Sequence, residues 1–132
     1  MAQIKYNLGN LSKEKYSTDE IVIGEWIDGK PLYRKVHYNN DPTKLVLGNN
    51  NDIDIPFINA DEIDSVARID GLIGQVNSKS STISIHSSWG SYNSIWIKVN
   101  NSTGNIQVHS ENNGNSYYIT TIIVEYTKTT DA

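Results

Sequence analysis

The first residues that could do chemistry are carboxylates gathered in one acidic stretch, from Asp52 to Asp64. The stretch contains Asp52, Asp54, Asp61, Glu62 and Asp64. Two such groups could act as the acid and base of a glycosidase, and several could bind calcium, which takes about six to eight oxygens. The segment 52–56 lacks the third ligand and the glycine of an EF-hand loop. We therefore interpret the stretch as a solvated acidic loop and expect neither a metal ion nor a cofactor.

Histidine and serine do not form a catalytic pattern either. His37, His86 and His109 lie in three different predicted strands, and no two have the spacing that places two metal ligands on one surface. Serine is abundant, but there is no Gly-x-Ser-x-Gly nucleophile motif, and the absence of cysteine removes thiolates and disulfides. The sequence predicts a protein that is not an enzyme, with a glycan depolymerase as the less favoured alternative.

The aromatic residues favour binding instead. Eight tyrosines and three tryptophans stand against one phenylalanine, so most aromatic side chains have an apolar body and a polar handle, which suits partly exposed surfaces. The loop over residues 87–94 carries Trp89 and Tyr92, although Trp89 could instead fold back over the core. Trp96 could be a sugar platform or a buried subunit contact. Together with Tyr117, which follows an Asn-rich loop, these are our candidate ligand-contacting residues.

The elements that would position these side chains are β-strands. The sequence holds 18 Ile, 16 Asn, 14 Ser and 9 Thr but only 6 Leu and 4 Ala, so strand and turn formers outnumber helix formers. A length of 132 residues suits one domain. We predict an all-β fold, a β-sandwich or jelly-roll-like single domain over residues 16–132, preceded by a short irregular N-terminal arm over residues 1–15.

Charge and hydropathy exclude two classes of partner. The formal net charge is -4, with no block of either sign, so the sequence lacks the basic surface expected for nucleic acid binding. No apolar run approaches the roughly 20 residues of a membrane span, and the amino end lacks the apolar stretch of a secretory signal. We expect no nucleic acid partner, no membrane insertion and no signal peptide.

A β-hairpin is the strongest local signal. Glu20–Trp26 and Leu32–Tyr38 are β-like, and Asp28-Gly29 between them supplies a residue that tolerates positive φ. Pro56 restricts its own segment to an edge strand or an extended link, because proline cannot donate to a ladder. Over 61–71 a three-residue spacing of Ile63, Val66 and Ile69 would suit a helix, but we favour a turn and then a strand. Further strands are expected at 44–47, 53–58, 81–87, 94–99 and 105–110.

Alternation predicts which side chains of the later strands face inward. In the strand over 94–99, Trp96 and Lys98 face outward and the branched residues between them face inward. In the strand over 105–110, Gln107 and His109 face outward. The final run, Tyr117–Thr127, is fairly apolar on both sides, with Ile119 placed opposite to Ile122. It should lie in the middle of a sheet, or a subunit partner should cover its second face.

Three segments carry a resemblance to a known family. They are Ile21–Lys35 (IVIGEWIDGKPLYRK), Ile58–Val66 (INADEIDSV) and Val124–Asp131 (VEYTKTTD). Together they resemble a β module in structural proteins of tailed phages and prophages of Gram-positive bacteria. That module reads Trp-x-Asp-Gly-Lys-Pro-[Leu/Ile]-Tyr-Arg-Lys and ends in Glu-Tyr-Thr-Lys-Thr-Thr-Asp. The order and spacing match from about Tyr16 to Asp131.

The resemblance implies a non-catalytic appendage of the virion, usually a homotrimer, that contacts other virion proteins and presents loops to a glycan or protein of the host surface. It brings no catalytic residue. It implies structural roles in the hairpin, where Trp26 and Tyr33 pack, Asp28 and Gly29 turn, and Arg34 pairs with a carboxylate. Members often carry the module after a long shaft, whereas this chain starts just before it. A capsid decoration or head-fibre protein therefore stays open as the alternative.

Overall fold

The computed structural model describes residues 15–84, 94–111 and 113–131. Within them it confirms the all-β prediction, because every regular element is a strand except one short 3-10 helix, η1. None of the described residues forms a helix long and apolar enough to cross a membrane. The elements are β1 (Ile21–Glu25), β2 (Pro31–Tyr38), β3 (Asn51–Ile55), η1 (Ala60–Glu62), β4 (Ile63–Gln75), β5 (Ser78–Ser84), β6 (Ser94–Val99), β7 (Ile106–Glu111) and β8 (Tyr117–Lys128).

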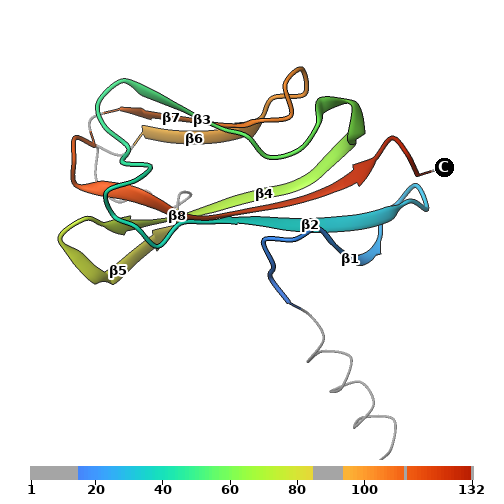
Figure 1. Ribbon diagram of the computed structural model, residues 1–132, viewed down its shortest axis with the longest axis horizontal. Coiled ribbons are helices and arrows are strands. Elements are labelled where there is room, and N and C mark those ends of the chain that lie inside the picture. Colours follow the sequence, from blue (N-terminus) through green and yellow to red (C-terminus); the bar gives the residue numbers. More distant parts are fainter. Residues whose placement is uncertain (1–14, 85–93, 112, 132) are drawn as a thin grey trace, which may run out of the picture.

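The strands form two antiparallel sheets packed as a sandwich (Figure 1). The larger sheet has the order β1-β2-β8-β4-β5, and the smaller one has the order β3-β7-β6. Inward side chains of both sheets share one core, whose fully buried members include Ile73, Ile106, Val108, Ile119, Ile122 and Val124. The predicted β-sandwich is therefore confirmed.

The predicted hairpin is confirmed as β1 and β2. Gly29 has a φ of 87°, and its N–H donates to the Trp26 carbonyl oxygen at 2.9 Å. The Asp28 side chain accepts a hydrogen bond from the Lys30 backbone N–H at 3.0 Å, as expected where an aspartate stabilises a turn. The turn residues therefore act locally and hold the two strands in register.

Strand β8 lies at the centre of the larger sheet, between β2 and β4, as its apolar faces predict. Its predicted alternation is wrong at one point. Leu72 of β4 pairs with Thr121, but the next residue, Ile73, pairs with Ile119, so β8 carries an extra residue in a β-bulge. The bulge turns both Ile119 and Ile122 into the core.

Three shorter predictions have mixed outcomes. The expected strand over 44–47 is wrong: Leu45 has a φ of 56°, and the segment makes one isolated bridge, from Val46 to Tyr118. The expected edge strand over 53–58 is confirmed in position but not in its bounds: β3 lies at an edge of the smaller sheet, spans Asn51–Ile55 and ends just before Pro56. The expected turn and strand over 61–71 are confirmed as η1 and β4.

Candidate functional site on the outer face of the smaller sheet

The outer face of the smaller sheet carries two cross-strand rows of polar and aromatic side chains. Strand register aligns one residue each from β3, β7 and β6 in every row, and alternation turns the residues between the rows into the core. The first row is Asp52, His109 and Trp96, and the second row is Asp54, Gln107 and Lys98. We call these six residues the Trp96 platform.

Trp96 is exposed but held in place. It is 46% exposed, so nearly half of its surface is available to a ligand. Its ring stacks on the His109 imidazole with centroids 5.3 Å apart and an interplanar angle of 18°. The Lys98 ammonium lies 5.4 Å from the Trp96 ring centroid, within the range of a cation–π contact. Neighbours on two strands therefore fix the indole, which lowers the entropy cost of binding against it.

His109 links the platform to two carboxylates. Its Nδ1 lies 2.6 Å from Asp52 Oδ1, and its Nε2 lies 3.3 Å from Glu111 Oε1. These hydrogen bonds, that to Asp52 being the stronger, raise the pKa of His109 above its usual value. A protonated imidazole donates from both nitrogens, so it can hold both carboxylates at once. Protonation therefore ties β3 to β7 beneath the Trp96 ring.

A pH titration followed by NMR should give His109 a pKa above about 6.5, the ordinary value for histidine. The bonds that favour the imidazolium stabilise the folded state fully below the unfolded pKa, and this contribution is lost as pH rises through the higher folded pKa. We expect Asp52→Asn to lower the His109 pKa. Asp54→Asn is the matched control, because Asp54 accepts from Asn105 rather than from His109. A His109 pKa unchanged in Asp52→Asn would contradict this assignment.

The platform borders a hollow of about 350 Å³ lined by Asp52, Ile53, Asp54, Trp96, Gln107 and His109. Its chemistry combines an aromatic ring with carboxylate acceptors and an amide that both donates and accepts. A sugar ring has apolar C–H faces and hydroxyl groups around its edge. An aromatic ring beside such polar groups therefore matches both parts of a sugar.

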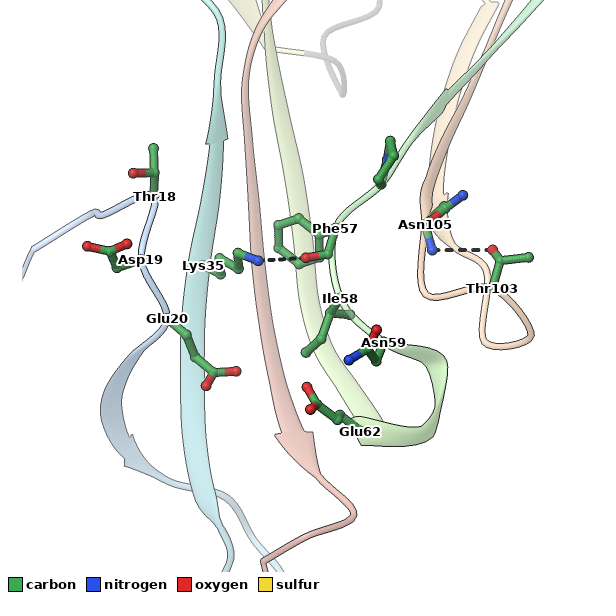
Figure 2. A pocket seen from close by; sticks show the side chains of 11 residues that line it. Thr18, Asp19, Glu20, Lys35, Phe57, Ile58, Asn59, Glu62, Thr103 and Asn105 are labelled. Atoms are coloured by element: carbon green, nitrogen blue, oxygen red, sulfur yellow. Dashed lines mark hydrogen bonds between the residues drawn. The ribbon is translucent and has the colours of Figure 1, made fainter.

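A second hollow of about 650 Å³ opens between the two sheets at the end of β3 (Figure 2). Thr18, Asp19, Glu20, Lys35, Glu62, Thr103, Asn105 and residues 56–59 line it. In Figure 2 the Lys35 ammonium points at the segment that follows β3, where it donates to the Phe57 carbonyl oxygen at 2.6 Å. We call this hollow the inter-sheet cleft.

The other candidate contact residues do not join the platform. Tyr117 is 9% exposed and belongs to the same core cluster as Leu47 from the segment before β3, whose N–H donates to the Tyr117 carbonyl oxygen at 2.9 Å. Tyr117 is thus buried instead of lying at the edge of a loop. Trp89 and Tyr92 lie outside the described residues.

The acidic stretch is divided between separate places instead of forming one loop. Asp52 and Asp54 lie on the platform, Glu62 lines the inter-sheet cleft, and the Asp64 carboxylate accepts from Lys30 Nζ at 2.7 Å. That hydrogen bond lowers the pKa of Asp64. In the described part of the chain, no group of three or more His, Asp or Glu side chains is arranged to hold a metal ion.

The hairpin residues lie in the packing of the larger sheet. The Tyr33 ring stacks on Tyr126 with centroids 5.9 Å apart, and its hydroxyl donates to Asp131 at 2.6 Å. The Arg34 guanidinium bonds Glu125 through Nε at 2.9 Å. Trp26 is half-buried beside the Asp28-Gly29 turn. These contacts give the hairpin a structural part in the fold.

Comparison with known proteins finds no relative. No family model, no curated protein and no solved structure matches the chain.

Proposed function

We propose that this protein binds glycans without cleaving them, through the Trp96 platform. The observation that carries the proposal is a 46% exposed tryptophan fixed by stacking on His109, beside a hollow lined with carboxylate and amide groups. A tryptophan that is both exposed and held by its neighbours offers a flat apolar surface beside polar groups, which is a common arrangement in ligand sites. The hydrogen-bonding groups around the hollow favour a hydroxyl-rich ligand over an apolar one.

We further propose that the protein is an attachment module of a phage particle, made in the host cytoplasm and carried on the virion. The three segments on which the resemblance rests contact one another in the fold. Lys30 bonds Asp64, Tyr33 bonds Asp131, and the Thr129 N–H donates to the Glu62 carbonyl oxygen at 3.0 Å. This mutual packing is what a shared structural framework needs, and it leaves the outer face of the smaller sheet for recognition. A capsid decoration or head-fibre role is the alternative.

A homotrimer is part of this proposal. The outer face of the larger sheet carries the half-buried Ile123 and the 60% exposed Tyr38, which suit a subunit contact. Three copies would repeat a weak sugar contact and raise the overall affinity by orders of magnitude. Light scattering should give a mass about three times the 14.8 kDa chain mass.

A glycan array followed by calorimetry tests the proposed function. We expect binding to a glycan of the bacterial surface, and Trp96→Ala should weaken it by about two- to tenfold, since an aromatic contact contributes about 0.5–1.5 kcal/mol. Ile27→Ala is the control, because Ile27 is a large apolar residue that is 88% exposed but lies in the hairpin turn of the other sheet.

Two results would count against the proposal. Equal glycan affinity of the wild type and Trp96→Ala would show that the Trp96 platform is not the binding surface. Release of reducing sugar from cell-wall material, lost in Asp52→Asn, would replace binding by catalysis, because Asp52 and Asp54 line one hollow.

A further inference from the structure

We propose that the Trp96 platform and the inter-sheet cleft form one extended site for a neutral, linear oligosaccharide of several sugar units. This inference rests on the proposed function and deepens it, since it names the class of glycan. The two hollows measure about 350 and 650 Å³, so a ligand that occupied both would be larger than one sugar.

A hydrogen bond joins the linings of the two hollows. Asn105, which lines the cleft, donates from Nδ2 to the Asp54 Oδ2 atom of the platform at 2.8 Å. The backbone makes the same connection, because Pro56 of the cleft follows Asp54 by two residues, a span of about 7 Å in extended chain. The linings of the two hollows are therefore adjacent at Asp54, which is where we propose that the ligand passes from one to the other.

The cleft is built for hydroxyl groups. Its acceptors are the carboxylates of Asp19 and Glu62, and its donors include the Lys35 ammonium and the Asn59 amide. Glu20 also lines it, but the two Glu20 oxygens already accept from the Tyr126 hydroxyl and from Lys128 Nζ. Lys35 Nζ uses one hydrogen bond on the Phe57 carbonyl oxygen and stands 4.8 Å from the Phe57 ring centroid. An ammonium has three N–H groups, so Lys35 can donate further. Acceptors and donors facing one space are what a sugar hydroxyl, which does both, requires.

Charge separates neutral from anionic glycans. Three carboxylates line the cleft and two line the platform hollow. Against them stand Lys35 in the cleft, Lys128, which pairs with Glu20 at 3.0 Å, and Lys98 beside Trp96. A phosphate-bearing wall polymer would meet an excess of like charge along this path, which disfavours binding. The site therefore favours an uncharged chain.

Calorimetry with sorted glycans tests the extended site. The probes are neutral polysaccharide fragments from Gram-positive cell walls, in one pool of mono- and disaccharides and one pool of hexa- to octasaccharides, with purified teichoic acid as the anionic probe. We expect the long pool to bind at least about tenfold tighter than the short pool. Glu62→Gln and Lys35→Met should each remove most of that advantage. Asp61→Asn is the control, because Asp61 neighbours Glu62 in η1 but does not line the cleft.

The possible outcomes test the extended site, the neutral glycan class and the platform separately. Equal affinity for both pools, with Trp96→Ala still weakening each, would overturn the extended site and leave the platform intact. A length advantage that Glu62→Gln and Lys35→Met do not reduce would also overturn it. Tighter binding of teichoic acid would overturn the neutral class. Binding of no probe would overturn the proposed function as well.

Discussion

Gly104→Ala is expected to lower the melting temperature by on the order of 10 °C or more. A Cβ at this position would lie 1.8 Å from the Ile58 carbonyl oxygen and 2.8 Å from the Ala60 nitrogen, both backbone atoms. Gly104 also has a φ of 75°, which side chains disfavour by about 1–2 kcal/mol. Adding about 1–3 kcal/mol for overpacking gives a loss of roughly 2–5 kcal/mol.

Gly114→Ala separates the effect of the positive φ from the effect of the steric clash in the same denaturation experiment. Gly114 has a φ of 51°, but no heavy atom of the described residues lies within 4 Å of the position that its Cβ would occupy. It should therefore show the conformational cost without the clash, about 1–2 kcal/mol. Equal losses in the two variants would contradict the steric argument. Because the Ile58 N–H donates to the Gly104 carbonyl oxygen at 3.1 Å, this contact also shapes one wall of the inter-sheet cleft.

Glu125→Ala is expected to reduce the free energy of unfolding by about 3–5 kcal/mol, the usual result of removing one partner of a buried ion pair. Glu125 Oε2 lies 2.8 Å from Arg34 Nη2 and 3.1 Å from Arg68 Nη1. The Arg34 and Glu125 side chains are 6% and 11% exposed, so water cannot replace the lost carboxylate well. The Tyr16 ring also shields the Arg34 guanidinium from water, because Arg34 Cζ lies 4.3 Å from the ring centroid.

Arg68→Ala is the control for Glu125→Ala in urea denaturation. Arg68 contacts the same carboxylate, but its side chain is 42% exposed, so its contribution should stay below about 1 kcal/mol. Similar losses of unfolding free energy in both variants would show that burial does not determine how strongly these ion pairs stabilise the fold.

Local alternation was enough to predict the orientation of the platform residues. Trp96 and Lys98 in β6, and Gln107 and His109 in β7, face outward as expected, because both strands are short and free of bulges. The hairpin was predictable for a similar reason, since its turn is encoded by adjacent residues. In each case the determining interactions lie within a few residues.

Strand partners and irregularities could not be predicted in the same way. Asp52 reaches His109 across 57 positions of sequence because β3 pairs with β7, and no local pattern specifies that choice. The bulge in β8 is set by its pairing with β4, so it broke an alternation that looked regular in sequence. Tyr117 became buried for a related reason, since it belongs to the same core cluster as Leu47 from a distant segment.

The central position of β8 has a consequence for synthesis on the ribosome. β8 follows all the other described strands in the chain, yet it bonds both β2 and β4, so these two long strands have no neighbour between them until β8 has been synthesised. Unpaired strand edges on a nascent chain are sites of aggregation. Premature termination before β8 would therefore release a polypeptide with its main sheet divided in two, which chaperones and proteases would have to clear.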